Sequence, residues 1–276
     1  MLPISAHGTT FPGRREVNQD DILQFYPTSN SFFLAVADGM GGVAGGQVAS
    51  EAVLDAAREY LNTRFRTAVQ PEHLKGILDD LYSCCQDAIN AVTKQRPSLQ
   101  GMGTTLTCVL GYEDAFVIGN LGDSRAYYLH EGTLTQVTED HSYLNELRRQ
   151  SGTQDLDPGL AAKYGHIVSK TLDGSGDEPD FFPKDRDCFS LHRGDGFLLC
   201  SDGVILDDLG DLEALFESYM LGTPNLQTAA ESLVSLAYLS GSTDNISVVL
   251  AEVDALERGG RDVRTYPFPP QTQEHA

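Results

Sequence analysis

Apolar positions along the chain form short runs bounded by turn residues and longer stretches with helical spacing. The short runs predict strands over residues 1–10, 22–26 and 32–37. Apolar side chains at helical spacing predict helices over residues 46–66 and 71–94, the second opened by a proline. Further strands are predicted over residues 104–111, 115–120, 125–130, 196–200 and 246–253, and further helices over residues 142–150, 207–221 and 224–239.

The order of these elements favours antiparallel sheets covered by helices. Glu113-Asp114 and Glu131-Gly132 are predicted to supply hairpin turns. The helices follow one another in pairs, which is typical of helices that cover the outer face of a sheet. A doubly wound parallel sheet would alternate strand and helix more strictly. Residues 151–184 have little periodicity and many Gly, Asp and Pro, so we expect a long surface excursion there.

Composition agrees with a folded protein that works inside the cell. The 276 residues are 41% hydrophobic, which is enough for a sizeable core. No apolar run reaches eighteen residues, and the first five residues lack the basic and apolar parts of a secretory signal. The five cysteines contain no CxxC pair and are expected to be reduced thiols. We therefore expect a cytoplasmic protein.

The formal net charge is −21, from 19 basic and 40 acidic residues. Such a chain repels nucleic acids and anionic membranes, so neither is expected as a partner. Acidity by itself indicates only a well-solvated surface. Carboxylates at positions other than a solvated face carry more information.

Five aspartates stand at the ends of predicted strands. They are Asp20, Asp38, Asp123, Asp202 and Asp244. Any one of them alone is typical of a turn, because aspartate hydrogen-bonds its own backbone and the glycine that often follows accepts positive φ. Together they suggest a site, since strand ends are held rigidly by a sheet. If the strands are neighbours, the carboxylates converge and must take up protons or bind cations.

Oxygen ligands without a His or Cys cluster suit hard cations such as Mg²⁺ or Mn²⁺. A pair of these ions can activate water and assist in-line displacement at phosphorus. The spacing alone therefore predicts a metal-dependent hydrolase or a phosphoryl-transfer site.

Several ordered motifs resemble the type 2C family of metal-dependent serine/threonine phosphatases (the PPM family), in its compact bacterial form. The motifs are residues 15–20 (REVNQD), 36–42 (VADGMGG) with 45–46 and 49–50, 101–105 (GMGTT), 119–125 (GNLGDSR), 140–142 (DHS), 200–203 (CSDG) and 242–247 (STDNIS). The resemblance runs from about residue 5 to 254. It implies a phosphatase domain over residues 1–256, with a flap at about 151–184 and a flexible tail at 257–276.

The implied fold is α+β, a four-layer α-β-β-α sandwich of two antiparallel sheets flanked by helix pairs. The implied activity is hydrolysis of phosphoserine and phosphothreonine in proteins by direct attack of a water that bridges two metals. The cofactors would be two or three Mn²⁺ or Mg²⁺ ions. The partners would be phosphorylated proteins and an opposing serine/threonine kinase, in a signalling role, and we expect a monomer.

The resemblance also implies a role for each site residue. Asp38 is similar to the carboxylate that bridges two metals, with the Gly39 carbonyl on one of them. Asp202 and Asp244 are similar to ligands of the other metal. By the same resemblance, Asp20 holds a metal-bound water and Asp123 joins Asp202 at a third metal. Arg15, which without the motif would be a surface arginine beside Arg14, is similar to the arginine that binds the substrate phosphate.

The chain departs from the family at its histidines. Met40 and Val43 occupy positions where many members carry a histidine proposed as the general acid. His141, in the 140–142 motif, is expected to be structural. We therefore predict that metal-bound water protonates the leaving group, which would give a flat acidic limb in the pH–rate profile.

Three alternatives remain open from the sequence. One is a pseudophosphatase or regulatory binding module on the same fold, which the presence of all five aspartates disfavours. Another is a metallohydrolase acting on a nucleotide or small metabolite. The last is a phosphatase controlled by a partner protein, which would differ in substrate and not in chemistry.

Overall fold

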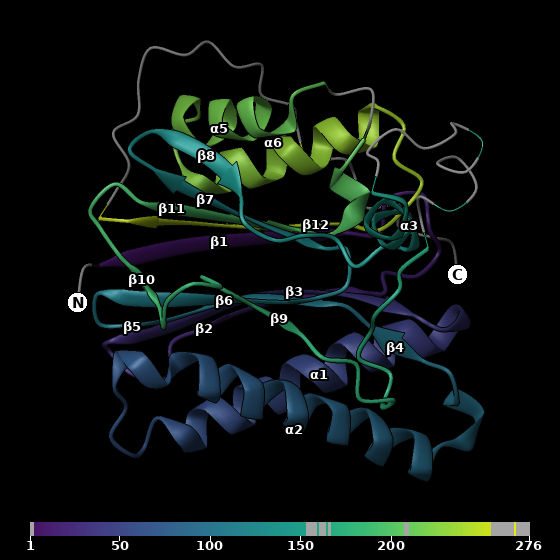
Figure 1. The fold of residues 1–276 in the computed structure, drawn as a ribbon. Coiled ribbons are helices and arrows are strands. Elements are labelled where there is room, and N and C mark those ends of the chain that lie inside the picture. The colour runs from purple at the N-terminus through teal and green to yellow at the C-terminus, as the bar shows by residue number, and fades with distance from the viewer. Residues whose placement is uncertain are drawn as a thin grey trace.

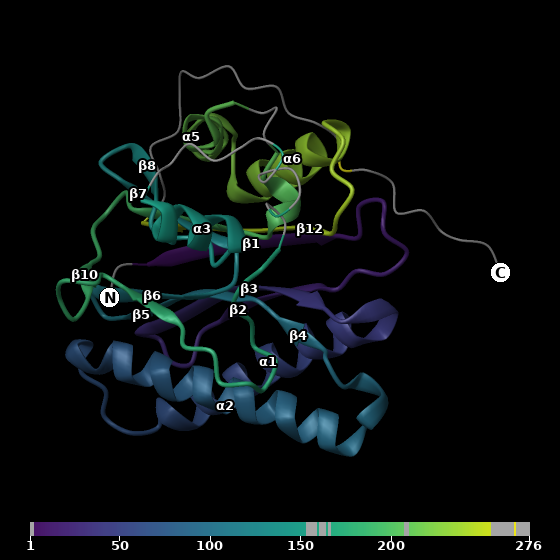
Figure 2. The same ribbon diagram turned by 45° about the vertical axis from the view of Figure 1, so that its right-hand side comes forward.

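Two antiparallel sheets pack face to face, and a pair of helices covers the outside of each sheet (Figure 1). The computed structural model describes residues 3–152, 159, 164, 167–206, 210–254 and 268. The turned view in Figure 2 again places both helix pairs outside the sheets. The predicted four-layer α-β-β-α sandwich is therefore confirmed.

The upper sheet in Figure 1 has five strands in the order β1-β12-β11-β7-β8. They are β1 (Ile4–Phe11), β12 (Ile246–Val253), β11 (Gly196–Cys200), β7 (Arg125–His130) and β8 (Thr133–Gln136). The lower sheet has seven strands, of which five follow the order β10-β6-β5-β3-β2 while β9 pairs with β6 and β4 with β3. They are β10 (Phe189–Ser190), β6 (Ala115–Leu121), β5 (Leu106–Tyr112), β3 (Ser31–Met40), β2 (Asp20–Phe25), β9 (Asp180–Phe182) and β4 (Gly103–Thr104).

The helices that cover the sheets are α1 (Gly42–Arg64) and α2 (Leu74–Gln95) below, and α5 (Leu212–Gly222) and α6 (Leu226–Leu239) above. A shorter helix, α3 (Tyr143–Ser151), belongs to neither pair (Figure 2). Short 3-10 turns occur at Pro71–His73, Pro97–Leu99 and Asp202–Val204. Among the described residues, no helix combines the length and the apolar character needed to cross a membrane.

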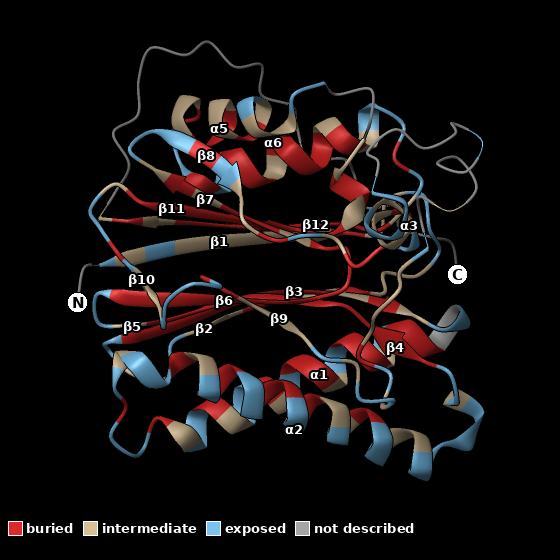
Figure 3. Cartoon of the chain, viewed as in Figure 1, coloured by how far each residue is buried: buried red, intermediate tan, exposed pale blue. Residues whose placement is uncertain are grey.

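Burial on both faces explains why the predicted strands read as continuous apolar runs. In β3, Phe33 and Ala35 pack against the lower helices, while Phe32 and Leu34 pack against the upper sheet. A strand between a helix layer and a second sheet has no solvated face, so it does not alternate polar and apolar residues. Figure 3 shows the resulting buried layers inside the sandwich.

Local sequence sets the ends of several helices. The side chains of Ser142, Asp211 and Asn225 each accept a hydrogen bond from the first turn of α3, α5 and α6 respectively. Such caps satisfy backbone N–H groups that have no partner within the helix. Gly152 follows α3 in the left-handed conformation that favours glycine.

The structure differs from the predicted elements mainly where strands are short. The strands β8, β9 and β10 lie outside the predicted strand ranges, and of β4 only Thr104 lies within one, because two to four residues carry too little periodicity. β9 lies within the predicted excursion at 151–184. Helix α1 begins at Gly42 and not near residue 46, and α5 begins at Leu212, while residues 207–209 lie outside the described residues.

Candidate metal and phosphate site

A cavity of ≈ 730 Å³ opens at one end of the sandwich, where strands from both sheets end. Its lining includes Arg15, Gln19, Asp38, Gly39, Met40, Asp123, Ile167, Val168, Asp202 and Asp244. All the predicted site residues except Asp20 therefore line this cavity, although they span most of the chain.

Strand pairing brings the aspartates into one place. Asp20 lies opposite Asp38 in the antiparallel register of β2 and β3. Asp202 follows β11, and Asp244 precedes β12, which is the neighbour of β11 in the other sheet. Strands of the two sheets therefore bring acidic side chains toward the same cavity from both sides.

The backbone of Asp38 is held by two threonines of the neighbouring chain segment. Its N–H donates to Thr105 Oγ1 at 2.9 Å, and its carbonyl accepts from Thr104 Oγ1 at 2.9 Å and from the Thr105 N–H at 2.8 Å. These three bonds fix the end of β3 where the side chain enters the cavity. The two threonines of the GMGTT motif therefore hold the backbone of Asp38 in position.

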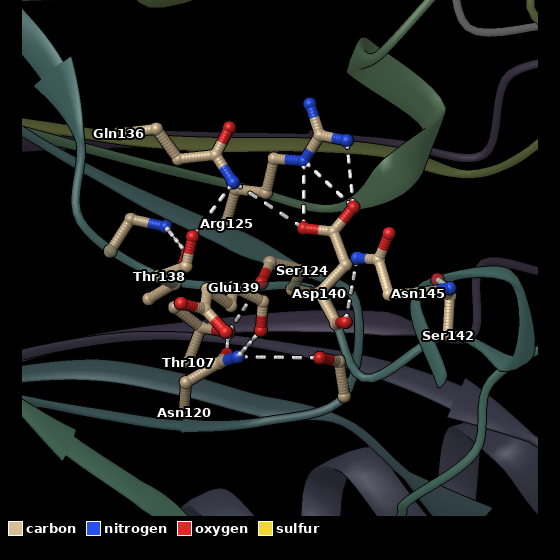
Figure 4. A network of polar contacts seen from close by, with 12 residues as sticks. Thr107, Asn120, Ser124, Arg125, Gln136, Thr138, Glu139, Asp140, Ser142 and Asn145 are labelled. Atoms are coloured by element: carbon tan, nitrogen blue, oxygen red, sulfur yellow. Dashed lines mark hydrogen bonds and ion pairs between the residues drawn. The ribbon is translucent and has the colours of Figure 1, made fainter. Parts of the chain in front are cut away.

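A polar network holds the turn that carries Asp123 (Figure 4). Arg125 forms a two-pronged ion pair with Asp140, with Nε–Oδ1 at 2.9 Å and Nη2–Oδ2 at 2.7 Å. Asn120 Nδ2 donates to the carbonyls of Gly122 and Glu139. The network joins the end of β6 to the segment before α3 and so limits the movement of Asp123. Asn120, Arg125 and Asp140 stand in the quoted motifs, but no pattern in the sequence indicates that they position Asp123.

Burial and mutual repulsion of the aspartates favour binding of protons or cations by their carboxylates. Burial, together with the charges of Asp202 and Asp244, raises the pKa of Asp20 to about 7, against hydrogen bonds from Ser247 and Ser201. Burial and the carboxylates of Asp202 and Asp140 raise the pKa of Asp123 to about 7. The pKa of Asp38 is raised well above its usual range by burial and by four neighbouring aspartates. Five carboxylates this close are mutually repulsive when ionised.

The donors fit divalent cations. Asp20 Oδ1 and Asp202 Oδ1 are buried, and neither has a hydrogen-bond partner among the described residues. A buried carboxylate oxygen without a partner is costly, and a cation bound there would satisfy it. Apart from the Arg15 guanidinium, every charged group that lines the cavity is a carboxylate. Carboxylate oxygens are ligands that suit Mg²⁺ or Mn²⁺.

Gly39 and Gly203 allow the segments of the site to approach closely. A Cβ at Gly39 would lie 2.1 Å from the Gly46 carbonyl oxygen, and a Cβ at Gly203 would lie 1.9 Å from the Asn245 carbonyl oxygen. Both obstacles are backbone atoms, so no side-chain rotation relieves them. These glycines are needed to bring β3 against α1, and the Asp202 turn against the start of β12.

Replacing Gly203 with alanine is expected to destabilise the protein by about 1–3 kcal/mol, the usual range for overpacking a buried site. Activity should fall as well, because the Asp202 turn must move away from Asn245. A matched control is Gly76→Ala in α2, where nothing lies within 4 Å of the added Cβ. That control should gain up to about 1 kcal/mol from helix propensity. Denaturant unfolding measures both, and equal stability of the two variants would contradict the close-approach argument.

Arg15 lies at the rim of the cavity and is anchored by the segment that precedes β12. Its Nη2 donates to Asp244 Oδ2 at 2.8 Å, and its Nε donates to the Thr243 carbonyl at 2.9 Å. The side chain remains about half exposed, at 51%. Asn245 secures the same loop, because its Nδ2 donates to the carbonyls of Pro12 and Val17 and its Oδ1 accepts from the Gln19 N–H.

His141 and Met40 bear on whether a histidine can serve as the general acid. Met40 lines the cavity, as its place in the VADGMGG motif suggests. His141 is buried; its Nδ1 accepts from the Gly122 N–H at 3.1 Å, and its Nε2 lies 3.3 Å from Asp180 Oδ2. Both ring nitrogens are engaged, and burial lowers the pKa of His141. The side chain of Val43 and residues 153–158 of the predicted flap lie outside the described residues, as does most of the tail.

Comparisons with known proteins agree with this geometry. The profile of the family described as "Protein phosphatase 2C" matches residues 8–236. The chain is 34% identical over 240 residues to the serine/threonine protein phosphatase PstP of Mycobacterium tuberculosis, with 87% of this chain covered. It spans only 43% of the length of that relative. It is 32% identical over 250 residues to the serine/threonine phosphatase stp of Listeria monocytogenes, covering 89% of this chain and 94% of the relative.

A solved structure is similar over almost the whole fold. The catalytic domain of the phosphatase PstP, crystallised with two manganese ions, superposes with a TM-score of 0.74 at 31% identity. The match covers 92% of this chain and 99% of the other.

Proposed function

This chain belongs to the protein phosphatase 2C family, and from that premise we propose that it removes phosphate from phosphoserine and phosphothreonine in proteins with divalent metal ions. The observation that carries the proposal is that four strand-end aspartates line one cavity and the fifth, Asp20, lies opposite Asp38 on the neighbouring strand. Asp20 and Asp202 each have a buried oxygen with no hydrogen-bond partner among the described residues. The manganese ions in the related PstP structure support Mn²⁺ as a cofactor. Mg²⁺ and the number of ions, two or three, are part of the proposal.

We assign the metal-holding residues as follows. Asp38, the Gly39 carbonyl, Asp202 and Asp244 would hold two cations, and Asp123 with Asp202 would hold a third. Asp20 would orient water from its position opposite Asp38. When bound, such cations lower the pKa of water and neutralise charge on a phosphate.

Arg15 would orient the substrate phosphate, and hydrogen bonds behind the aspartates would keep the carboxylates in place. Arg15 would bind the phosphoryl group, because a guanidinium fork pairs with two phosphate oxygens at once. Its bonds to Asp244 and Thr243 hold the fork at the rim. The network behind Asp123 and the threonines behind Asp38 keep the carboxylates in place between turnovers.

Protonation of the leaving oxygen would depend on water, since His141 is buried and engaged at both nitrogens. The flat acidic limb predicted from the sequence therefore remains our proposal. A pKa near neutrality in the rate profile that disappears in His141→Gln would contradict it.

Replacing Arg15 with alanine is expected to lower kcat/KM on phosphopeptides by about 10–100-fold, mainly through KM. Arg15→Lys should recover only part of the loss, because an ammonium cannot bind two oxygens in a fork. Arg14→Ala is the matched control, since Arg14 instead contacts Ser242 and Tyr238. Steady-state kinetics on one phosphopeptide separates these cases, and an equal loss in both variants would argue against the assignment of Arg15.

We also propose the wider setting of the activity. The domain would cover residues 1–256 with a flap at about 151–184, and the protein would act as a monomer in the cytoplasm against a serine/threonine kinase. Ile167 and Val168 line the cavity, which supports a role for the flap in substrate access. A pseudophosphatase remains the alternative, and the presence of all five aspartates disfavours it.

The decisive experiment measures phosphate release by the purified chain with and without Mn²⁺. Phosphoserine, phosphothreonine and phosphotyrosine peptides of one sequence should be compared with a small aryl phosphate. We expect Mn²⁺-dependent release from the serine and threonine peptides. Binding of phosphopeptides without turnover would favour the pseudophosphatase, and turnover of nucleotides alone would favour a metabolite hydrolase.

A further inference from the structure

A second group of metal-binding side chains lies away from the candidate phosphatase site. It consists of His130, His192 and Asp195, one ligand atom of each lying within 4.8 Å of the others. His130 ends β7, and the other two belong to the turn that precedes β11. They border a cavity of ≈ 530 Å³, which Glu131 and Leu221 also line.

The carboxylate of this group is buried and held in place. The Asp195 side chain is 1% exposed, and its Oδ2 accepts hydrogen bonds from the Tyr128 hydroxyl and from the His192 N–H. Its Oδ1 lies 2.8 Å from His130 Nδ1. Burial and the Asp195 carboxylate raise the pKa of Tyr128, so the phenol keeps its proton and donates. Oδ2 therefore accepts the positioning bonds and lies 3.6 Å from His192 Nδ1, while Oδ1 faces His130.

The two histidines supply nitrogen ligands from the solvent side. Their side chains are 42% and 57% exposed, and the ring centroids lie 5.3 Å apart. Tyr128 stacks on the His130 ring and limits its rotation. Arg193 lies in the same turn, but its Nε pairs with Asp254 Oδ2 at 2.8 Å, so its charge is compensated. The cavity therefore offers two imidazoles and one carboxylate, with the solvent side left for a further ligand.

This group is remote from the aspartates described above. Asp195 and Asp202 stand at opposite ends of β11, which for an extended chain is a separation of about 20 Å. In Figure 1 the β7–β8 turn lies at the left of the sandwich, whereas β4 and α3 lie at the right. The two sites differ in chemistry as well, because the phosphatase site offers carboxylate oxygens and this one offers nitrogens.

We propose that His130, His192 and Asp195 form a binding site for one late first-row divalent cation, with Zn²⁺ as the favoured ion. Two imidazoles and a carboxylate leave one position of a tetrahedron for water, a donor set that Zn²⁺ accepts and Mg²⁺ disfavours. The cation would connect the end of β7 to the turn before β11. It would stabilise the upper sheet without contributing to turnover.

The test titrates the purified chain with Zn²⁺ in a buffer containing excess Mg²⁺, which keeps the oxygen-only site filled. Wild type should bind one equivalent that His192→Ala lacks, or binds on the order of tenfold or more weakly. His73→Ala, at an exposed histidine before α2, is the matched control and should keep the equivalent. Co²⁺ in place of Zn²⁺ should give the strong visible absorption of a tetrahedral nitrogen site in wild type and in the control only.

Thermal unfolding adds a second readout. Zn²⁺ should raise the melting temperature of wild type and His73→Ala more than that of His192→Ala, while all three hydrolyse an aryl phosphate equally with Mn²⁺. His130→Ala repeats the test from the β7 side. Equal Zn²⁺ stoichiometry and equal melting shifts in wild type, His192→Ala and His130→Ala would overturn the proposal and leave the group as a hydrogen-bonded cluster.

Discussion

Asp38→Asn is expected to lower phosphatase turnover by at least about 100-fold, the upper end of the loss seen for groups that only support a metal ligand. Asp38 is buried and faces four other aspartates, and both raise its pKa well above the usual range. An amide in its place has nearly the same shape but supplies no charge and one fewer oxygen. The loss should appear in kcat with Mn²⁺ at saturation, and manganese affinity should fall as well.

Asp21→Asn is the control for this substitution. Asp21 lies on the neighbouring strand β2, opposite Ala37, but its side chain interacts with Glu51, Asp55 and Arg58 on α1. It should therefore keep near wild-type activity. Full activity of Asp38→Asn, or an equal loss in Asp21→Asn, would contradict the assignment of Asp38.

Metal-free Asp38→Asn should nevertheless fold, and this separates a lost ligand from a lost structure. Removing one carboxylate from the cluster reduces repulsion among those that remain. All three backbone bonds between Asp38 and the threonines are independent of its side chain. An inactive variant that melts at or above the wild-type temperature in a chelator is the expected outcome.

The sequence pattern indicated which aspartates end the predicted strands, but it contained no information on the order of the strands in each sheet. Asp38 and Asp202 were found because each ends a long apolar run that the two-sided burial of its strand produces. That Asp20 lies opposite Asp38 depends on the pairing of β2 with β3. Convergence of these two with Asp202 depends on packing between the sheets, which no local pattern encodes.

Other parts of the site could be recognised only from motifs or not at all. Arg15 has no distinguishing local pattern, and its bond to Asp244 joins residues from opposite ends of the chain. The ion pair of Arg125 with Asp140 lies within motifs, but its role in holding Asp123 becomes apparent only from the geometry. His130 and His192 are brought together by the pairing of β7 with β11, so their separation in sequence concealed them.

The metal-free protein is expected to lose stability as the pH rises from about 4 to about 7. The pKa of Asp20 and of Asp123 is about 7 in the folded chain, whereas an unfolded aspartate has a pKa of about 3.9. A raised folded pKa means that the folded state binds the proton more tightly. Its relative stability is therefore full below the unfolded pKa and is lost as the pH passes through the folded pKa.

The size of this effect follows from the shift. About three pH units at 1.36 kcal/mol each correspond to roughly 4 kcal/mol for one such carboxyl, of which about 2 kcal/mol falls between pH 5.5 and pH 8. The two groups share neighbours, so their contributions do not simply add. Denaturant unfolding in a chelator at these two pH values should show a free energy of unfolding lower at pH 8 by about that amount.

Two substitutions and the addition of Mg²⁺ test whether the carboxylate cluster causes this pH dependence of stability. Asp20→Asn should remove much of the pH dependence, because the amide still accepts the Ser201 bond but carries no titrating proton. Asp79→Asn, at an exposed position on α2, should leave it unchanged. Mg²⁺ should restore stability at pH 8 far more than at pH 5.5, since a cation binds the ionised carboxylates and competes with their protons. If Mg²⁺ stabilised the protein equally at both pH values, the carboxylate cluster would not be where it binds.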